Sequence, residues 1–222
     1  MRKVLIQALV FLPIMLSTGV NQACNGQKHV DEAYWEVVTQ HAENIVLSLG
    51  IDDSVKFYRV RDIIAQQYYD LNDIQGKSKK EQLRIKYGKG SAVGKTEKLR
   101  DAQTAFDKKT EKLHEAFLRN LSGEINANQL EEVKNGMSAD VLPKTYSEYQ
   151  AMIPDLTQEE KDQIYQWLVE ARDEAMMAGL SQEKSDWFKK YKRKIDNYLS
   201  SHGHDLKKLN EEWGKRIRAT PQ

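Results

Sequence analysis

One stretch of the sequence carries polar side chains at the spacing of a helix face. Arg59, Asp62, Gln66 and Asp73 recur at intervals of three, four and seven residues, which places them together on one side of a helix. Carboxylate, amide and guanidinium groups in such a stripe can bind sugar hydroxyls or acidic sugars. The candidate binding residues are Arg59, Arg61, Asp62, Gln66, Asp70 and Asp73 and, in a later aromatic-tipped segment, Tyr146.

The same stripe has two less specific interpretations. Polar faces are routine on amphipathic helices, so it can be a hydrated surface, or it can be a buried polar network between helices. Carboxylates at the separation of Asp62 and Asp70 are also the kind of group that acid–base catalysis uses. The sequence alone does not decide whether the protein is an enzyme, and it assigns no catalytic residue.

The element that must position this stripe is a long helix with an apolar seam. The seam consists of Phe57, Val60, Ile64, Leu71 and Ile74. A second helix, at 96–121, repeats the sevenfold spacing at Leu99, Phe106 and Leu113. Two long helices with matching seams predict an antiparallel helical hairpin. The glycine-containing, basic residues 76–94 are expected to form the loop between them, with a helical segment at 79–86 left open as an alternative.

Caps and apolar spacing divide the rest of the chain into helices. We expect helices at 31–49, 52–74, 96–121, 127–135, 146–152, 158–178, 181–199 and 205–217. Asp31, Asp205 and either Asp52 or Asp53 are the expected caps, and capping boxes are predicted at Asn126 with Gln129, Thr145 with Glu148 and Thr157 with Glu160. No segment shows strand alternation. The predicted fold is all-α, a bundle of about seven or eight helices.

The first 23 residues have the three regions of a secretory signal peptide. Arg2 and Lys3 precede an apolar run from Val4 to Leu16, and small or polar residues follow. The run is too short for a comfortable membrane span, and no later segment is apolar enough to form one. We therefore expect an exported protein, periplasmic or at the cell surface, with residues 24–222 as a single helical domain.

Cys24 is the only cysteine, so no disulfide can form within the chain. A lipid anchor on Cys24 is the less favoured alternative, because Asn21, Gln22 and Ala23 do not resemble the usual approach to a lipidated cysteine. Without residues 1–23 the charged side chains nearly balance, with 32 basic against 33 acidic. A nearly neutral chain has no global field that would steer it onto nucleic acid or an anionic membrane, so no nucleic-acid partner is expected.

Two local motifs fail as cofactor or metal sites. The sequence from Gly90 to Thr96 resembles a phosphate-binding loop, but it is one residue short between its glycines and follows no buried strand. His202, His204 and Asp205 are too few to complete a metal shell, and Asp205 is better explained as a helix cap. We therefore expect no metal and no cofactor.

Four segments resemble an uncharacterised secreted family of Bacteroidetes: residues 59–73, 141–146, 167–175 and 187–199. This resemblance implies an exported, all-helical protein whose relatives are often encoded among genes for degrading plant polysaccharides such as pectin. It carries over no catalytic residue. A weaker similarity, at 156–160, is to periplasmic chaperones with repeated L-T-x-x-Q segments, whose final Gln is absent here.

Three functions remain open at the level of sequence. The first is an envelope accessory protein that binds a plant-cell-wall oligosaccharide or a protein partner during polysaccharide use. The second is a periplasmic chaperone or scaffold, which requires an exposed apolar patch. The third is a carboxylate-dependent hydrolase or lyase acting on uronic-acid sugars. The sequence does not identify the ligand or the oligomeric state.

Overall fold

The computed structural model describes residues 22–180 and 183–219, with side chains described for 32–180 and 184–219. The described chain is all-helical and contains no strand. Its helices are α1 (Gln22–Leu47), α2 (Ser54–Tyr87), α3 (Ala92–Glu124), α4 (Ala127–Met137), α5 (Val141–Met152), α6 (Gln158–Met177), α7 (Glu183–Ser201) and α8 (Leu206–Ala219). The all-α prediction is confirmed. The predicted signal peptide falls almost wholly outside the described residues, as does the side chain of Cys24.

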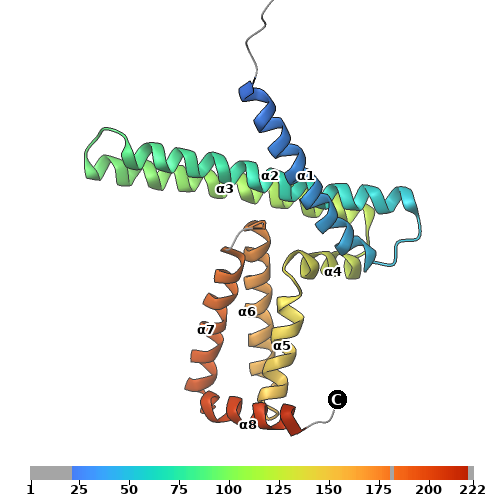
Figure 1. Ribbon diagram of the computed structural model, residues 1–222. Helices are drawn as coiled ribbons and strands as arrows, with labels where there is room; N and C mark the ends of the chain where they lie inside the picture. The colour runs from blue at the N-terminus through green and yellow to red at the C-terminus, as the bar shows by residue number, and fades with distance from the viewer. Residues whose placement is uncertain (1–21, 181–182, 220–222) are drawn as a thin grey trace, which may run out of the picture.

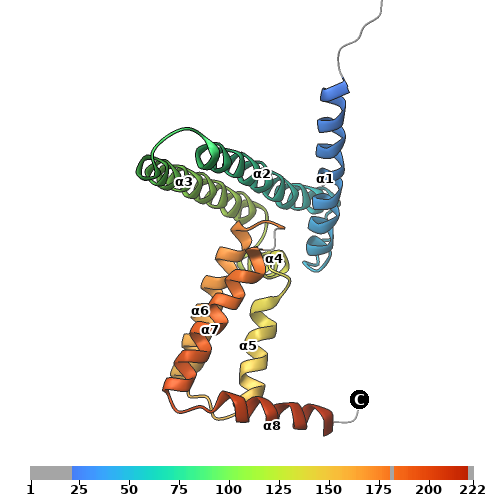
Figure 2. The same ribbon diagram turned by 60° about the vertical axis from the view of Figure 1, so that its left-hand side comes forward.

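The molecule has two arms that meet at α4. Helices α2 and α3 lie side by side as a long crossbar, which α1 crosses at one end (Figures 1 and 2). Helices α5, α6 and α7 run away from this crossbar, and α8 lies across their far end (Figure 1). None of the described helices is long and apolar enough to cross a membrane.

Helices α2 and α3 run in opposite directions. Arg59, near the start of α2, contacts Glu124 at the end of α3. At the other end, the Lys95 ammonium donates a hydrogen bond to the Lys86 carbonyl. Val60 and Ile64 of the apolar seam of α2 are fully buried in a core shared with α1, α3 and α4. Leu71 is fully buried beside Gly179 at the end of α6, and Phe57 and Ile74 are partly buried. The polar stripe therefore lies on the side of α2 opposite the side that is buried in the core.

A second apolar core fills the other arm. Leu142, Tyr149, Ile164, Leu168 and Ile195 are its buried members from α5, α6 and α7, and side chains of α8 pack against them. This core is separate from the one beneath α1 and α2. Each arm thus has its own apolar centre, and α4 connects them.

Several caps formed as predicted. Asp53 accepts hydrogen bonds from the backbone N–H groups of Val55 and Lys56, and Asp205 accepts one from Lys208. The capping boxes of Asn126 with Gln129 and Thr157 with Glu160 are complete. Gly50 and Gly179 end their helices in the left-handed region, with φ of 62° and 63°, a conformation that favours glycine. The expected start at Ser181 lies outside the described residues.

The structure corrects the predicted loop at 76–94. Helix α2 continues to Tyr87, so only residues 88–91 connect it to α3. A glycine inside a helix costs only about 1 kcal/mol, and Gly76 does not end α2. Ion pairs within the helix support its basic half, including Lys77 with Asp73 and Arg84 with Glu81.

Two other helix starts were predicted wrongly. Helix α1 already begins at Gln22, so Asp31 lies inside it and is not its cap. Helix α5 begins at Val141, ahead of Thr145, which rules out the predicted Thr145–Glu148 capping box. Pro143 occupies the first turn of α5, where its missing N–H would have had no helical partner. Residues 141–145, which the predicted helices left between 135 and 146, are therefore helical.

Candidate functional site

The structure brings four of the predicted binding residues to one groove. Arg59, Asp62, Gln66 and Asp70 of α2 line a shallow groove against α3. Each has a partner within the protein. Arg59 contacts Glu124 at 3.1 Å; Asp62 contacts Arg61 at 2.7 Å; Gln66 donates a hydrogen bond to Asp70 at 2.8 Å. The groove is open to solvent; Arg59 and Asp62 are held in ion pairs, and Asp70 accepts its hydrogen bond from the neutral Gln66.

The other three predicted residues lie elsewhere. Arg61 points toward α1, with its guanidinium 3.8 Å from Glu43 and 4.7 Å from the ring centre of Tyr58. Asp73 is paired with Lys77 at 2.6 Å, one turn further along. Tyr146 belongs to α5 in the other arm, where its ring meets that of Tyr165 edge-on with centroids 5.2 Å apart. The predicted set is thus spread over more than one surface.

A better-formed pocket lies between α5, α7 and α8, at the far end of the second arm. It has a volume of about 370 Å³, within the lower range of small-molecule sites. Helix α5 contributes Thr145, Glu148, Tyr149 and Met152; α7 contributes Lys192 and Asp196; α8 contributes Leu206, Lys207, Asn210, Glu211 and Trp213. Helix α5 therefore builds one site together with the consecutive helices α7 and α8, which follow it only after α6.

Tyr149 and Asp196, which both line this pocket, are joined by a hydrogen bond. The Tyr149 hydroxyl donates to the Asp196 carboxylate at 2.6 Å, and the Tyr149 side chain is buried. Burial raises the pKa of Tyr149, and the hydrogen bond to Asp196 raises it further. Tyr149 therefore stays a protonated donor at neutral pH and is not available as a base. It fixes the position of the Asp196 carboxylate at the pocket wall.

Several charged groups of the pocket have no internal partner. Lys192, Lys207 and Glu211 form no ion pair or side-chain hydrogen bond within the described part of the chain. Glu148 likewise forms none, and its negative charge contributes to the raised pKa of Tyr149. Trp213 lines the same space and is only partly buried. Ammonium groups, carboxylates and an indole ring thus line the pocket, where they can interact with a ligand.

A buried polar network joins the two arms near α4. The Arg172 side chain of α6 is only 2% exposed, and its guanidinium lies 2.7 Å from Glu131 and 3.2 Å from Asp173. The Lys184 ammonium of α7 donates to the Met137 carbonyl at 2.6 Å and lies 5.7 Å from the ring centre of Tyr68. Burial lowers the pKa of Lys184 to about 8. Because every one of these cations has partners inside the protein, we assign this network to structure.

His204, near the start of α8, has a structural role. His204 Nε2 lies 2.8 Å from a carboxylate oxygen of Glu160. Burial raises the pKa of Glu160, but hydrogen bonds from the Thr157 backbone and from His204 outweigh it, so that the pKa lies below its ordinary value. Within the described chain, no group of three or more His, Cys, Asp or Glu side chains could hold a metal ion.

Sequence reasoning missed the α5–α7–α8 pocket because its residues share no local pattern. Lys192 and Asp196 are four apart on α7, and Asn210 and Trp213 are three apart on α8, which are ordinary helical spacings. The available signal was the tryptophan of α8, since a large aromatic residue in a short, charged terminal helix needs either a core or a ligand. The mutual placement of α5, α7 and α8 could not be derived from it.

Comparisons with known proteins bear on the whole chain. A search of curated proteins found no match. The family model described as protein of unknown function, DUF3826, matches residues 35–219. This span covers most of both arms, from α1 to the last residue of α8. The chain therefore belongs to the DUF3826 family.

Proposed function

We propose that the protein is exported and binds an acidic oligosaccharide in the pocket between α5, α7 and α8. The observation that carries this proposal is the gathering of Lys192, Lys207 and Trp213 around one hollow, with no ion pair to either lysine from the residues that the structure describes. Unpaired ammonium groups beside an aromatic ring are a binding surface for a ligand that is both flat-faced and negatively charged.

The chemistry of a uronic-acid sugar fits these groups. Its carboxylate can form charge-assisted hydrogen bonds with Lys192 or Lys207, and its hydroxyls can donate to Glu148 or accept from Asn210. One apolar face of a sugar ring can lie against the Trp213 indole. The resemblance to an exported family encoded among genes for pectin breakdown supports the choice of a uronic-acid sugar.

Calorimetric titration of the purified protein with galacturonic-acid oligosaccharides tests the proposal. We expect binding that weakens about tenfold or more in Trp213→Ala, equivalent to roughly 1.4 kcal/mol. The double variant Lys192→Gln with Lys207→Gln should weaken binding further and remove its dependence on salt. Neutral oligosaccharides of the same length should bind much more weakly to the unmodified protein.

Two controls locate the site. Lys189→Gln with Lys208→Gln removes two charges from the same two helices at exposed positions outside the pocket, and it should leave binding unchanged. Asp62→Ala with Gln66→Ala removes two residues of the α2 groove. Loss of binding in this second control, with full binding in the pocket variants, would move the proposed site to the α2 stripe.

A second candidate, a hydrolase or lyase acting on the same sugars, is favoured by the carboxylates of the pocket. Glu148, Asp196 and Glu211 line one hollow, and paired carboxylates perform acid–base steps on glycosides. Prolonged incubation with polygalacturonate, followed by assays for reducing ends and unsaturated products, separates the two functions. Product formation that depends on Glu148 or Glu211 would make the protein an enzyme, and intact polymer would leave it a binding protein.

A further inference from the structure

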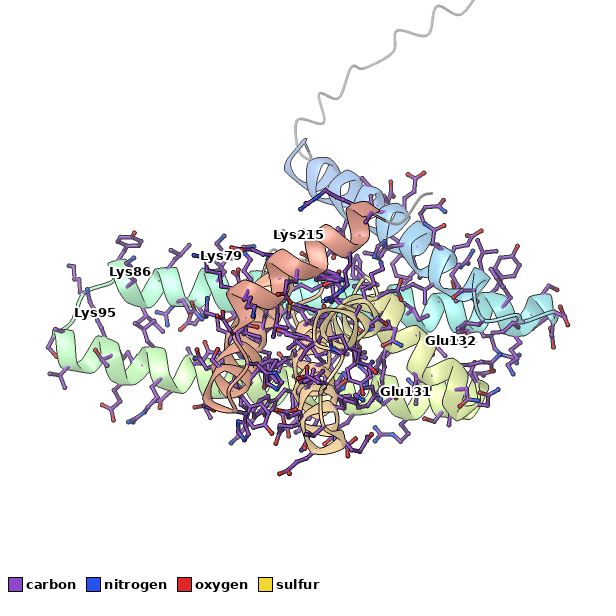
Figure 3. All side chains as sticks on the ribbon, turned by 90° about the horizontal axis from the view of Figure 1, so that it is seen from below. Lys79, Lys86, Lys95, Glu131, Glu132 and Lys215 are labelled. Atoms are coloured by element: carbon purple, nitrogen blue, oxygen red, sulfur yellow. The ribbon has the colours of Figure 1, made fainter. Side chains whose placement is uncertain are left out.

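The free end of the α2–α3 hairpin concentrates positive charge. Residues 77–100 carry nine Lys or Arg against two Glu, a net charge of +7 in a chain whose formal net charge is +1. Lys86 and Lys95 lie at the extreme end of the hairpin, far from the second arm. Lys79 lies on α2, further from that end (Figure 3). Lys80 and Lys89 form no ion pair within the described chain. The rest of the protein is correspondingly acidic.

Apolar side chains stand among these lysines. Tyr87 is 76% exposed and Val93 is 79% exposed, and Leu83 one turn before Tyr87 is 45% exposed. Tyr87 and Val93 flank the connection between the two helices, so they are at the tip itself. An exposed aromatic and a β-branched residue at the end of a projecting element have no role in the core. Such residues are typical of a surface that meets an apolar phase.

The tip has a fixed shape. Gly90 has a φ of 144°, in the region that favours glycine, and a Cβ added at Gly88 would lie 2.6 Å from the Arg84 carbonyl oxygen. The hydrogen bond from Lys95 to the Lys86 carbonyl joins the two helices, and the Ser91 hydroxyl accepts from the Gly94 N–H as the cap of α3. These contacts join the ends of α2 and α3 at the tip, which presents its lysines and its apolar side chains together.

We propose that this hairpin tip docks on the surface of an anionic lipid bilayer. Lysines attract the phosphates of anionic lipids, while Tyr87 and Val93 enter the interfacial region, where aromatic side chains with a polar end are favoured. A soluble polyanion would engage the lysines but would gain nothing from an exposed valine. The position of the tip at the end of a projecting hairpin also lets it reach a bilayer ahead of the more acidic remainder (Figures 1 and 3).

Co-sedimentation of the full chain with lipid vesicles tests this docking. We expect binding to vesicles of phosphatidylglycerol and phosphatidylcholine in equal amounts, loss of binding at high salt, and little binding to phosphatidylcholine alone. Lys80→Gln with Lys86→Gln and Lys89→Gln should weaken binding roughly a hundredfold, since each lysine near an anionic surface contributes about fivefold. Tyr87→Ser with Val93→Ser should weaken it about tenfold or more through lost apolar burial.

A matched variant guards against a simple effect of net charge. Lys108→Gln with Lys109→Gln and Lys112→Gln removes three exposed lysines from α3 away from the tip, and it should bind vesicles as the unmodified protein does. Circular dichroism checks that all variants keep their helices. Equal loss in this variant would overturn the proposal. So would undiminished binding of the Tyr87→Ser, Val93→Ser variant to vesicles together with equal affinity of the unmodified protein for duplex DNA, which would make the tip a general polyanion site.

Discussion

The polar stripe of α2 and the α5–α7–α8 pocket differ in where their charged groups find partners. In the stripe, Asp62 is paired with the adjacent Arg61, and Gln66 with Asp70 one turn away. In the pocket, Lys192 and Lys207 come from different helices and form no ion pair in the described chain. Neighbours on one helix satisfy each other at little cost. A binding site is better sought where distant segments bring together groups that remain unsatisfied.

The largest expected effect concerns the core beneath the stripe. Ile64 is fully buried under the exposed face of α2, so Ile64→Ala should lower the free energy of unfolding by roughly 2–5 kcal/mol. Urea denaturation followed by circular dichroism measures this change. If Ile64→Ala left the free energy of unfolding unchanged, Ile64 would not lie in the core, and the assignment of the buried and polar sides of α2 would be wrong.

A smaller loss is expected beneath the pocket. Tyr149→Phe removes the hydrogen bond to Asp196 while keeping the ring in the core. A hydrogen bond to a charged group contributes about 1.5–3 kcal/mol, and water in the pocket can recover part of this for Asp196. We expect a loss of roughly 1–2 kcal/mol in urea denaturation, together with weaker sugar binding because Asp196 is no longer held. Unchanged stability and affinity would remove Tyr149 from the site.

The junction between the two arms contains a third kind of charged group, the Lys184 ammonium, which is buried and hydrogen-bonded. Burial lowers the pKa of Lys184 to about 8 from an ordinary 10.5. Between these two pH values the unfolded chain binds more protons on this side chain than the folded chain does. Stability therefore rises with pH across that interval, because below about pH 8 both states hold the proton and folding must bury the charge.

The pH effect of Lys184 is measured by comparison with Lys184→Met. Urea denaturation of both proteins from pH 8 to pH 10 should show the unmodified protein gaining stability relative to the variant as the pH rises. The pKa of His41 is lowered by burial from its ordinary 6.5, so its titration falls below this range. A constant difference between the two proteins would mean that Lys184 is solvated as an ordinary lysine.

The fold was predictable because its signals are local. Apolar spacing placed Val60, Ile64 and Leu71 in the core, and the caps at Asp53, Asn126 and Thr157 formed as expected. The errors occurred where two local signals conflicted. Gly76 and a run of lysines suggested a loop, although helical ion pairs were also available there. The next helix was predicted to begin at 146, although the first turn of a helix accepts a proline such as Pro143.

The candidate site was less predictable because it depends on how helices meet. Arg59, Asp62, Gln66 and Asp70 share a groove because they share a helix face, which spacing can show. Tyr146 does not join them, since α5 belongs to the other arm. Lys192, Asn210 and Trp213 come together only through the packing of α7 on α6 and of α8 on α5. Spacing along the chain contains no information about that tertiary arrangement.

The smallest expected effect returns to the stripe itself. Asp62 is about half exposed, and within the described residues its one ion pair is with the adjacent Arg61. Exposed pairs contribute little because water and salt screen them, so Asp62→Ala should change the free energy of unfolding by no more than about 0.5 kcal/mol. Arg61 would still keep Glu43 at 3.8 Å and the Tyr58 ring. Urea denaturation at low and high salt checks this, and the small difference should vanish at high salt. A loss of stability comparable to that of Ile64→Ala would show that Asp62, Arg61 and Glu43 act together in joining α1 to α2. The stripe would then be a structural network, and its side chains would not be free to bind a ligand.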